Sequence, residues 1–176
     1  MYDFTQKTPL LHTNRLVLRP LVDSDAEDVL AILCNDKVKL TYMLPDFSNP
    51  EDAIKLFQRL LTLSHAAEHL VVGICCDEQL IGFLNSTEIV NDTIEVGYAF
   101  HPAYWNHGYA TEALTAIIPE LFRLGFSTVR AGYFSENPAS GRVMEKSGMY
   151  RIEQTDTIAY RGTEHHCLYY EICKPS

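Results

Sequence analysis

One segment constrains the fold of this chain more than any other: a strand pattern that leads through a short glycine-bearing turn into an amphipathic helix. Residues 93–100, "TIEVGYAF", alternate apolar and polar side chains as a half-buried strand does. Apolar residues then recur at helical spacing from Ala110 to Leu124, and Gly125 can end that helix. The order of strand, loop and helix places the backbone N–H groups that begin the helix above the end of the strand.

The turn itself, within "YWNHGYATEA", is a candidate phosphate site with a single glycine, Gly108. Phosphate oxygens need N–H donors and positive potential, and a helix N-terminus supplies both. Glycine is required only where a side chain would block the ligand or where φ must be positive, so one glycine can suffice. The segment has neither the GxGxxG pattern of dinucleotide-binding folds nor the GK[ST] of a P-loop. By itself it is equally consistent with a plain strand-to-helix turn.

The rest of the chain predicts one α/β domain over residues 1–176, with a mixed sheet and helices on its faces. Pro119 lies inside the helical pattern that follows Gly108, where it removes one backbone hydrogen bond and should kink the helix, at a cost of about 3 kcal/mol unless packing compensates. The expected strands are 15–21, 70–76, 79–89, 93–100, 127–134, 149–160 and 165–174, and the expected helices are 25–33, 51–69, 110–124 and 137–148.

Charge and cysteine content exclude several classes of function. The net charge is −9, from 14 Lys+Arg against 23 Asp+Glu, which argues against nucleic-acid and anionic-membrane partners and suits a cationic substrate such as an amine. No apolar run approaches the roughly 18 residues of a membrane span, and no secretory signal begins the chain, so a cytoplasmic location is expected. The five cysteines form no CxxC pair, and "HHC" at 165–167 lacks further ligands, so no metal is expected.

Two segments together resemble a known family. "IEVGYAFHPAYWNHGYATEAL" and "ENPASGRVMEKSGM" are similar to signatures of the GNAT superfamily of N-acetyltransferases, closest to its RimJ/RimL branch. The hexapeptide at 105–110 matches the pyrophosphate motif, with Trp105 in place of the usual Gln or Arg. "TNRLVLRPL" resembles the N-terminal element of the family, and the resemblance extends from about Leu11 to Ile172.

The resemblance implies a fold, a donor and a set of contacts. The fold is a mixed, mostly antiparallel sheet of about seven strands with a splayed central pair, flanked by about four helices. The donor is acetyl-CoA, used without a metal, with its pyrophosphate on the amides of 106–111 and its pantetheine arm beside 98–101. The residues expected to contact acetyl-CoA are Tyr98, Ala99, Phe100, His101, Asn106, His107, Gly108, Tyr109, Ala110, Thr111, Asn137 and Ser140.

Catalytic roles follow from the same resemblance, and each has a plainer alternative. Glu95 stands where several members place a glutamate base, but it also reads as a solvent-facing strand carboxylate; Glu88 is the reserve candidate. Ser140 is a candidate for protonating the leaving thiolate, or only an exposed helical serine. Asn137 is a candidate catalytic and pantetheine contact that the Asn-Pro sequence equally explains as a helix N-cap. A backbone N–H at or near Phe100 is the expected oxyanion donor.

Other residues have readings that stay open. His101 and His107 could shuttle protons, although exposed loop positions explain them as well. Arg15 and Arg19 match the first strand of the family, where a structural or dimer-interface role is as consistent as contact with substrate. Four aromatic residues either line a substrate pocket or pack in the core or loops: Tyr42, Phe47, Tyr104 and Tyr160.

The sequence therefore predicts an enzyme that transfers acetyl from acetyl-CoA to a primary amine, either a protein N-terminal amine or a small molecule. A GNAT-fold protein that binds acyl-CoA without turnover is the alternative, and a different nucleotide-binding α/β protein is a third. The segments expected to select the amine, 36–50 and 155–165, carry no recognisable code. Dimers are frequent in the family, so a homodimer is the assembly to test.

Overall fold

The computed structural model describes Phe4, residues 11–45, Phe47 and residues 49–175. Its core element is an eight-stranded sheet in the order β1-β2-β3-β4-β5-β6-β8-β7. The strands are β1 Leu11–His12, β2 Val17–Arg19, β3 Val71–Cys76, β4 Gln79–Val90, β5 Thr93–Phe100, β6 Thr128–Phe134, β7 Tyr150–Tyr160 and β8 Thr163–Cys173. The α-helices are α1 Ala26–Leu33, α2 Asp36–Lys39, α3 Pro50–Ser64, α4 Tyr109–Leu124 and α5 Pro138–Lys146, with 3₁₀ turns at Asp23–Asp25 and Pro102–Tyr104.

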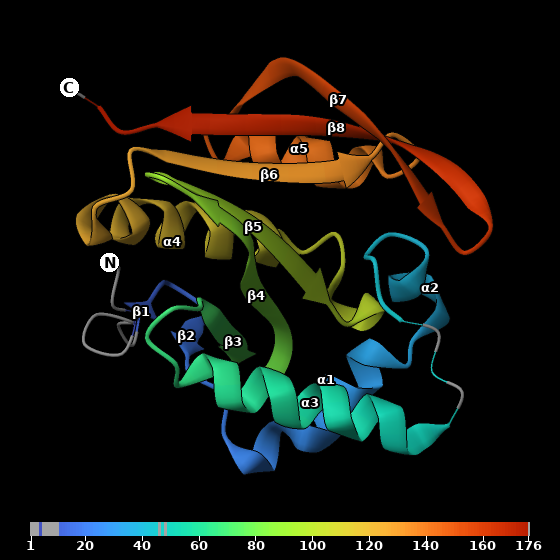
Figure 1. Cartoon of the computed structure of the whole chain (residues 1–176). Coiled ribbons are helices and arrows are strands. Elements are labelled where there is room, and N and C mark those ends of the chain that lie inside the picture. The colour runs from blue at the N-terminus through green and yellow to red at the C-terminus, as the bar shows by residue number, and fades with distance from the viewer. Residues whose placement is uncertain (1–3, 5–10, 46, 48, 176) are drawn as a thin grey trace.

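The sheet opens in its middle, between β5 and β6. These two strands run parallel and pair only over Thr93–Glu95 and Thr128–Arg130, whereas every other neighbouring pair is antiparallel. Figure 1 shows them side by side at one end and separated at the other. A β-bulge in β4 between Ser86 and Glu88 lies opposite the last of these pairs, where it adds local twist. The predicted splayed pair is therefore present.

Helices cover the two faces of the sheet in two separate layers (Figure 1). One apolar cluster joins α4 and α5 to the sheet, and it contains Ile94, Val96 and Phe100 of β5. A second cluster joins α1 and α3 to the opposite face, and it contains Ala99 of the same strand. Because side chains alternate between the faces of a strand, Glu95 points to the α1/α3 face.

The expectations for the N-terminal elements and for the segment after α1 differ from the structure. The strand expected over 15–21 is reduced to Val17–Arg19, because a turn closed by Thr13 N–H donating to the Leu16 carbonyl (2.9 Å) precedes it and pairs it with the short β1. The four-residue α2 was expected to be part of a loop; Asn35 caps it by accepting from the Lys37 N–H at 3.0 Å. These two short elements account for the eighth strand and the fifth helix.

Helix α4 continues through Pro119 to Leu124 and ends at Gly125, whose φ is 111°. Both Pro119 and Thr115, whose carbonyl loses its partner to the proline, are exposed, so water can solvate that carbonyl. Proline is therefore tolerated on the solvent side of this helix.

Within the described residues, no helix is long and apolar enough to cross a membrane. The same part of the chain contains no group of three or more His, Cys, Asp or Glu side chains that could hold a metal ion.

Candidate active site

A cavity of about 950 Å³ lies where β5 and β6 diverge. Both strands contribute to its walls, together with the loop before α4 and the first turns of α5. Most of the residues expected to contact acetyl-CoA line it: Tyr98, Ala99, Phe100, Asn106, Gly108, Tyr109, Ala110, Thr111, Asn137 and Ser140. The catalytic candidate Glu95 lines the same cavity, so the structure brings these predicted residues together.

The loop before α4 is held in shape by its own residues. The Trp105 indole N–H donates to the Phe100 carbonyl at 2.8 Å, which ties the loop to the end of β5. His107 Nδ1 lies 2.7 Å from the Trp105 carbonyl oxygen. The Glu112 N–H donates to the Gly108 carbonyl at 3.0 Å, so α4 begins its hydrogen-bond ladder there. The N–H groups of 109–111 precede that ladder and have no carbonyl acceptor within the helix, which is the arrangement an anion can use.

The two histidines of this region do not line the cavity. His101 Nδ1 accepts from the Ala103 N–H at 3.3 Å and caps the 3₁₀ turn. The His107 ring stacks on the Tyr109 ring with centroids 5.9 Å apart. Both side chains thus have local structural contacts, and only the backbone of His107 remains a candidate for contact with phosphate.

The wall formed by β5 and α5 contains a pair of hydroxyl groups. The Tyr98 hydroxyl oxygen lies 2.9 Å from Ser140 Oγ and 3.3 Å from the Ser140 carbonyl oxygen. Burial raises the pKa of Tyr98, against the opposing effect of the hydrogen bond with Ser140, so the phenol is neutral at physiological pH. Asn137 is the N-cap residue of α5, but its side chain makes no capping hydrogen bond there. Its amide is therefore available for another contact.

Glu95 lies between two charged neighbours at the point where the sheet opens. Burial raises the pKa of Glu95, and the Glu88 carboxylate across the β4–β5 pair raises it further. A hydrogen bond from Thr87 Oγ1 (3.1 Å) and the charge of Arg130 on β6 act in the opposite direction. A half-buried carboxyl group with a raised pKa suits proton transfer near neutral pH. Glu88 is exposed and does not line this cavity; together with Glu95 it lines a second, smaller cavity of about 270 Å³.

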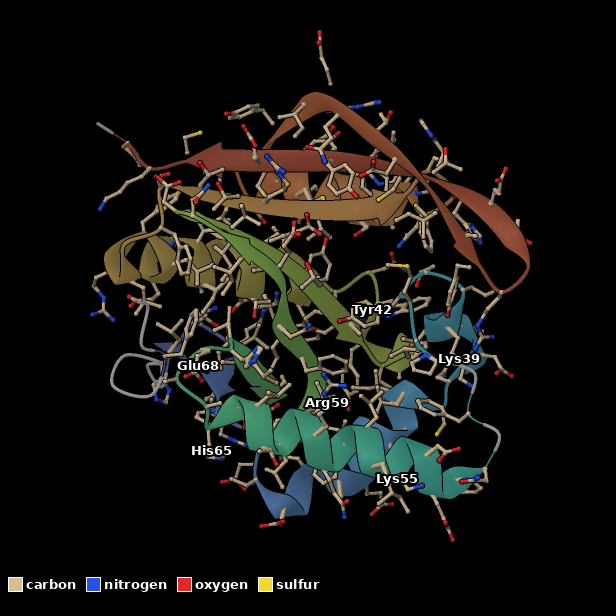
Figure 2. All side chains as sticks on the ribbon, viewed as in Figure 1. Lys39, Tyr42, Lys55, Arg59, His65 and Glu68 are labelled. Atoms are coloured by element: carbon tan, nitrogen blue, oxygen red, sulfur yellow. The ribbon has the colours of Figure 1, made fainter. Side chains whose placement is uncertain are left out.

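On the α1/α3 side, Tyr42 forms part of the cavity wall (Figure 2). Its hydroxyl donates to Asn85 Oδ1 at 2.5 Å, and burial raises its pKa. Tyr104, from the 3₁₀ turn, also lines the cavity. Tyr160 instead anchors the segment after α2, because its hydroxyl lies 2.8 Å from the Lys39 carbonyl oxygen and 3.0 Å from that of Leu44.

Phe47 and Arg19 lie outside the cavity wall as well. The Lys39 Nζ lies 5.8 Å from the centroid of the Phe47 ring, so this ring packs against the last residue of α2. The Arg19 guanidinium forms a two-pronged pair with Asp25 at 2.7 and 2.8 Å, which fixes the start of α1. Both have structural roles in this fold.

Several residues that line the cavity were not predicted from the sequence. Asn85 and Thr87 are polar residues at the end of the apolar run of β4, a break in pattern that could have identified them. Arg142 and Lys146 are four residues apart on α5 and line the cavity from one face, a spacing that could have been read from the sequence. Tyr169 comes from β8, and its ring fits because Gly132 on β6 has no Cβ; one there would lie 2.7 Å from that ring.

The sheet that opens between β5 and β6 and the cavity at that opening are the fold and site of an acyltransferase, and comparison with known proteins gives the family. Residues 15–150 match the acetyltransferase (GNAT) domain, and the chain belongs to this family. It is therefore an N-acetyltransferase with acetyl-CoA as the acetyl donor. The predicted membership and fold are confirmed.

The particular relatives are bacterial. The uncharacterized N-acetyltransferase YoaA of Bacillus subtilis is 31% identical over 173 residues, covering 95% of this chain and 98% of YoaA. YnaD of the same organism, also described as an uncharacterized N-acetyltransferase, is 30% identical over 160 residues, covering 90% and 92%.

Solved structures share the fold. A GNAT-family acetyltransferase from Bacillus anthracis superposes with a TM-score of 0.80 at 25% identity and covers 98% of each chain. RimL, a ribosomal L7/L12 alpha-N-protein acetyltransferase solved with coenzyme A, has a TM-score of 0.81 at 18% identity and covers 93% of this chain and 97% of RimL. At this identity the second match shows that RimL has the same fold.

Proposed function

We propose that this enzyme acetylates a primary amine that enters from the α1/α3 side of the cavity and meets the thioester beside Glu95. The observation that carries the proposal is one cavity with three kinds of group on its walls. A half-buried carboxyl group (Glu95), a hydroxyl pair (Tyr98 and Ser140) and the start of α4 all face it. A proton acceptor, a proton donor and an anion site are what acetyl transfer from CoA to an amine requires.

Acetyl-CoA would lie along the opening between the strands. Its pyrophosphate would accept hydrogen bonds from the N–H groups of 106–111, in the positive end of the α4 dipole. Its pantetheine arm would pair with the edge of β5 over Tyr98–Phe100, because that edge has no strand partner beyond Glu95 in the described sheet. The Asn137 side chain, which does not cap its helix, is available to the pantetheine amides.

The chemical step is attack of the neutral amine on the thioester carbon. An ammonium ion cannot attack, so Glu95 accepts a proton from it, directly or through water. The amine nitrogen bonds to the carbonyl carbon, and a backbone N–H at or near Phe100 stabilises the oxyanion that forms. The C–S bond then breaks, and Ser140 donates a proton to the departing thiolate. The second proton of the attacking nitrogen passes through water to the Ser140 oxygen as the amide forms, and Glu95 returns its own proton to solvent. The Tyr98 hydroxyl, 2.9 Å from Ser140 Oγ, stays protonated and positions that serine.

The acceptor is a primary amine of a protein N-terminus or of a small molecule. Two structures with this fold support keeping both classes: RimL is described as a ribosomal L7/L12 alpha-N-protein acetyltransferase, and MccE, a microcin C7 self-immunity acetyltransferase, was solved with acetyl-CoA and AMP (TM-score 0.80 at 16% identity). The net charge of −9 favours a cationic acceptor. The five cysteines, none of which is in a disulfide, suit a reducing cytoplasm, and a homodimer is the expected assembly.

The test is steady-state release of free CoA thiol with a panel of amines. The panel contains N-terminal peptides of ribosomal proteins, free amino acids and polyamines, each with acetyl-CoA. Turnover with at least one of these amines is the expected result. Tight binding of CoA without turnover on any of them would instead identify an acyl-CoA-binding protein, the second candidate function.

A further inference from the structure

The turn between β1 and β2 is fastened to the first turn of α4 through one carboxylate, that of Glu112. Glu112 Oε1 accepts from Thr13 Oγ1 at 2.6 Å and from the Arg15 backbone N–H at 2.9 Å. Glu112 Oε2 accepts from Arg15 Nε at 2.7 Å, and Arg15 Nη2 is also 2.7 Å from it. Both carboxylate oxygens are therefore held by residues almost one hundred positions earlier in the chain.

The same arginine reaches the loop that precedes α4. Arg15 Nη1 donates to the His107 carbonyl at 3.0 Å. Its Cζ lies 4.5 Å above the centroid of the Tyr109 ring, in cation–π geometry. Between these two contacts, a Cβ built on Gly108 would lie 3.5 Å from Arg15 Nη2. Arg15 thus lies against three consecutive residues of the loop, and its side chain remains 40% exposed.

Glu112 creates an electrostatic problem at this place. A carboxylate in the first turn of a helix is favourable with the helix dipole, but it repels a phosphate bound to the N–H groups of the same turn. Partial burial alone would raise the pKa of Glu112; the hydrogen bonds from Thr13 and Arg15 outweigh it and lower that pKa, so the group is charged at neutral pH. The chain is acidic overall, so the loop needs a cation of its own.

We propose that Arg15 is a positioning residue for the donor site, one that fixes the loop at 107–109 and offsets the charge of Glu112. With Arg15 in place, the loop offers its N–H groups to a pyrophosphate without a net negative neighbour. The inference rests on the proposed location of the pyrophosphate. It assigns to Arg15 a role in affinity for acetyl-CoA, and none in the chemical step.

The experiment is a double-mutant cycle of Arg15→Met and Glu112→Gln, in which the dissociation constant of CoA is measured by calorimetry and KM and kcat by thiol release. Methionine keeps the length of the side chain without its charge. Arg15→Met should weaken CoA binding by about tenfold or more and leave kcat nearly unchanged, because it exposes the phosphates to the Glu112 charge. Glu112→Gln should tighten binding a few-fold, and the double variant should recover most of the loss.

Acetyl-pantetheine, which lacks the pyrophosphate, separates charge compensation from a general loosening of the site. The effect of Arg15→Met on KM should be much smaller for acetyl-pantetheine than for acetyl-CoA. Arg123→Met is the matched control, because Arg123 pairs with Glu120 on the same helix, near the end remote from the loop. It should leave CoA affinity at the wild-type value.

Three outcomes would overturn the proposal: wild-type affinity in Arg15→Met, an equal loss for both donors, or a double variant weaker than Arg15→Met. If Arg15→Met does not fold, Glu112→Gln alone decides, because weaker binding in that variant contradicts charge compensation. A wild-type enzyme that binds no CoA would instead refute the proposed donor site itself.

Discussion

At the scale of single residues, the environment of Glu95 determines what this carboxyl group can do. Burial and the facing Glu88 favour its protonated form, while Thr87 and Arg130 favour the charged form, and the sum raises its pKa. A raised pKa makes a carboxylate a better proton acceptor at neutral pH. The same raised pKa means that ionised Glu95 destabilises the folded state, because water solvates the carboxylate better in the unfolded chain.

Replacement of Glu95 should remove the proposed base. We expect Glu95→Gln to lower kcat by roughly 10²- to 10⁴-fold and to leave KM for acetyl-CoA nearly unchanged. Glu88→Gln should keep activity but lower the pKa of Glu95, because it removes the facing negative charge. The acidic limb of the kcat/KM profile should therefore move to lower pH. Measured pH profiles of both variants check this, and an unchanged kcat in Glu95→Gln would contradict the assigned role.

Glu95→Gln also has a predicted effect on the stability of the folded state. A carboxyl group whose pKa rises on folding stabilises the folded state while it is protonated, and that contribution is lost as the pH rises through the folded pKa. Glu95→Gln should therefore raise Tm at pH 7, and the difference from wild type should vanish near pH 3, where both side chains are neutral. Thermal unfolding at the two pH values measures it; a lower Tm at pH 7 would refute the raised pKa.

At the scale of elements, the backbone of the loop before α4 shows why this turn needs only one glycine. Two of its residues have left-handed backbone conformations, Asn106 with φ 64° and Gly108 with φ 80°. Asparagine tolerates this region better than most residues, so only the second position uses glycine. Trp105, the departure from the family motif, ties the loop to β5 through its indole N–H. The loop therefore keeps its shape with an asparagine and a tryptophan beside its one glycine.

Gly108→Ala tests this loop against a matched glycine elsewhere. Gly162, in the β7–β8 turn, has φ 75° and no atom within 4 Å of its Cβ position, so alanine causes similar backbone strain at both sites, about 1–2 kcal/mol. Only Gly108→Ala should raise KM for acetyl-CoA severalfold, because its methyl group would lie 3.5 Å from Arg15 Nη2, beside the N–H groups proposed to bind phosphate. Kinetics of both variants decide the matter; equal KM values in the two would show that the loop does not contact the donor.

At the scale of the whole molecule, the opening in the sheet makes ligand binding and stability depend on each other. The parallel junction of β5 with β6 consists of Thr93–Glu95 paired with Thr128–Arg130, and beyond it the two halves of the sheet face a cavity. A CoA arm in that opening would contact both halves. Ligand that binds only the folded state stabilises it by mass action.

We therefore expect CoA to raise the melting temperature. At a concentration of one hundred times its dissociation constant, it should add about 2.7 kcal/mol to the free energy of unfolding. For a chain of 176 residues this corresponds to a rise in Tm of roughly 5–11 °C. NAD and ATP at equal concentration should give smaller shifts. Stabilisation by NAD or ATP but not by CoA would contradict the proposed donor site.

Much of the architecture could be predicted from the sequence, because helical and strand periodicities are local. The strands from 70 to 100, helix α4 and the turn at Gly108 were expected close to their observed positions. Helix α2 was missed because it is only four residues long and lies in a segment held by a distant side chain, the hydroxyl of Tyr160. Pro119 does not end its helix, which continues to Leu124, and both Pro119 and Thr115 are exposed, so water can solvate the Thr115 carbonyl.

For the site, the sequence alone determined the loop, the strand beside it and the candidate carboxylate, since each is a contiguous pattern with its own chemical meaning. Only the tertiary structure determined which side chains form hydrogen bonds with one another. Tyr42 meets Asn85 across 43 residues, Tyr98 meets Ser140 across 42, and Arg15 meets Glu112 across 97. No local pattern records such contacts, because they form only when strands and helices pack. The sequence predicts where an anion and an amine would bind, and the packing of the sheet determines which side chains lie at those places.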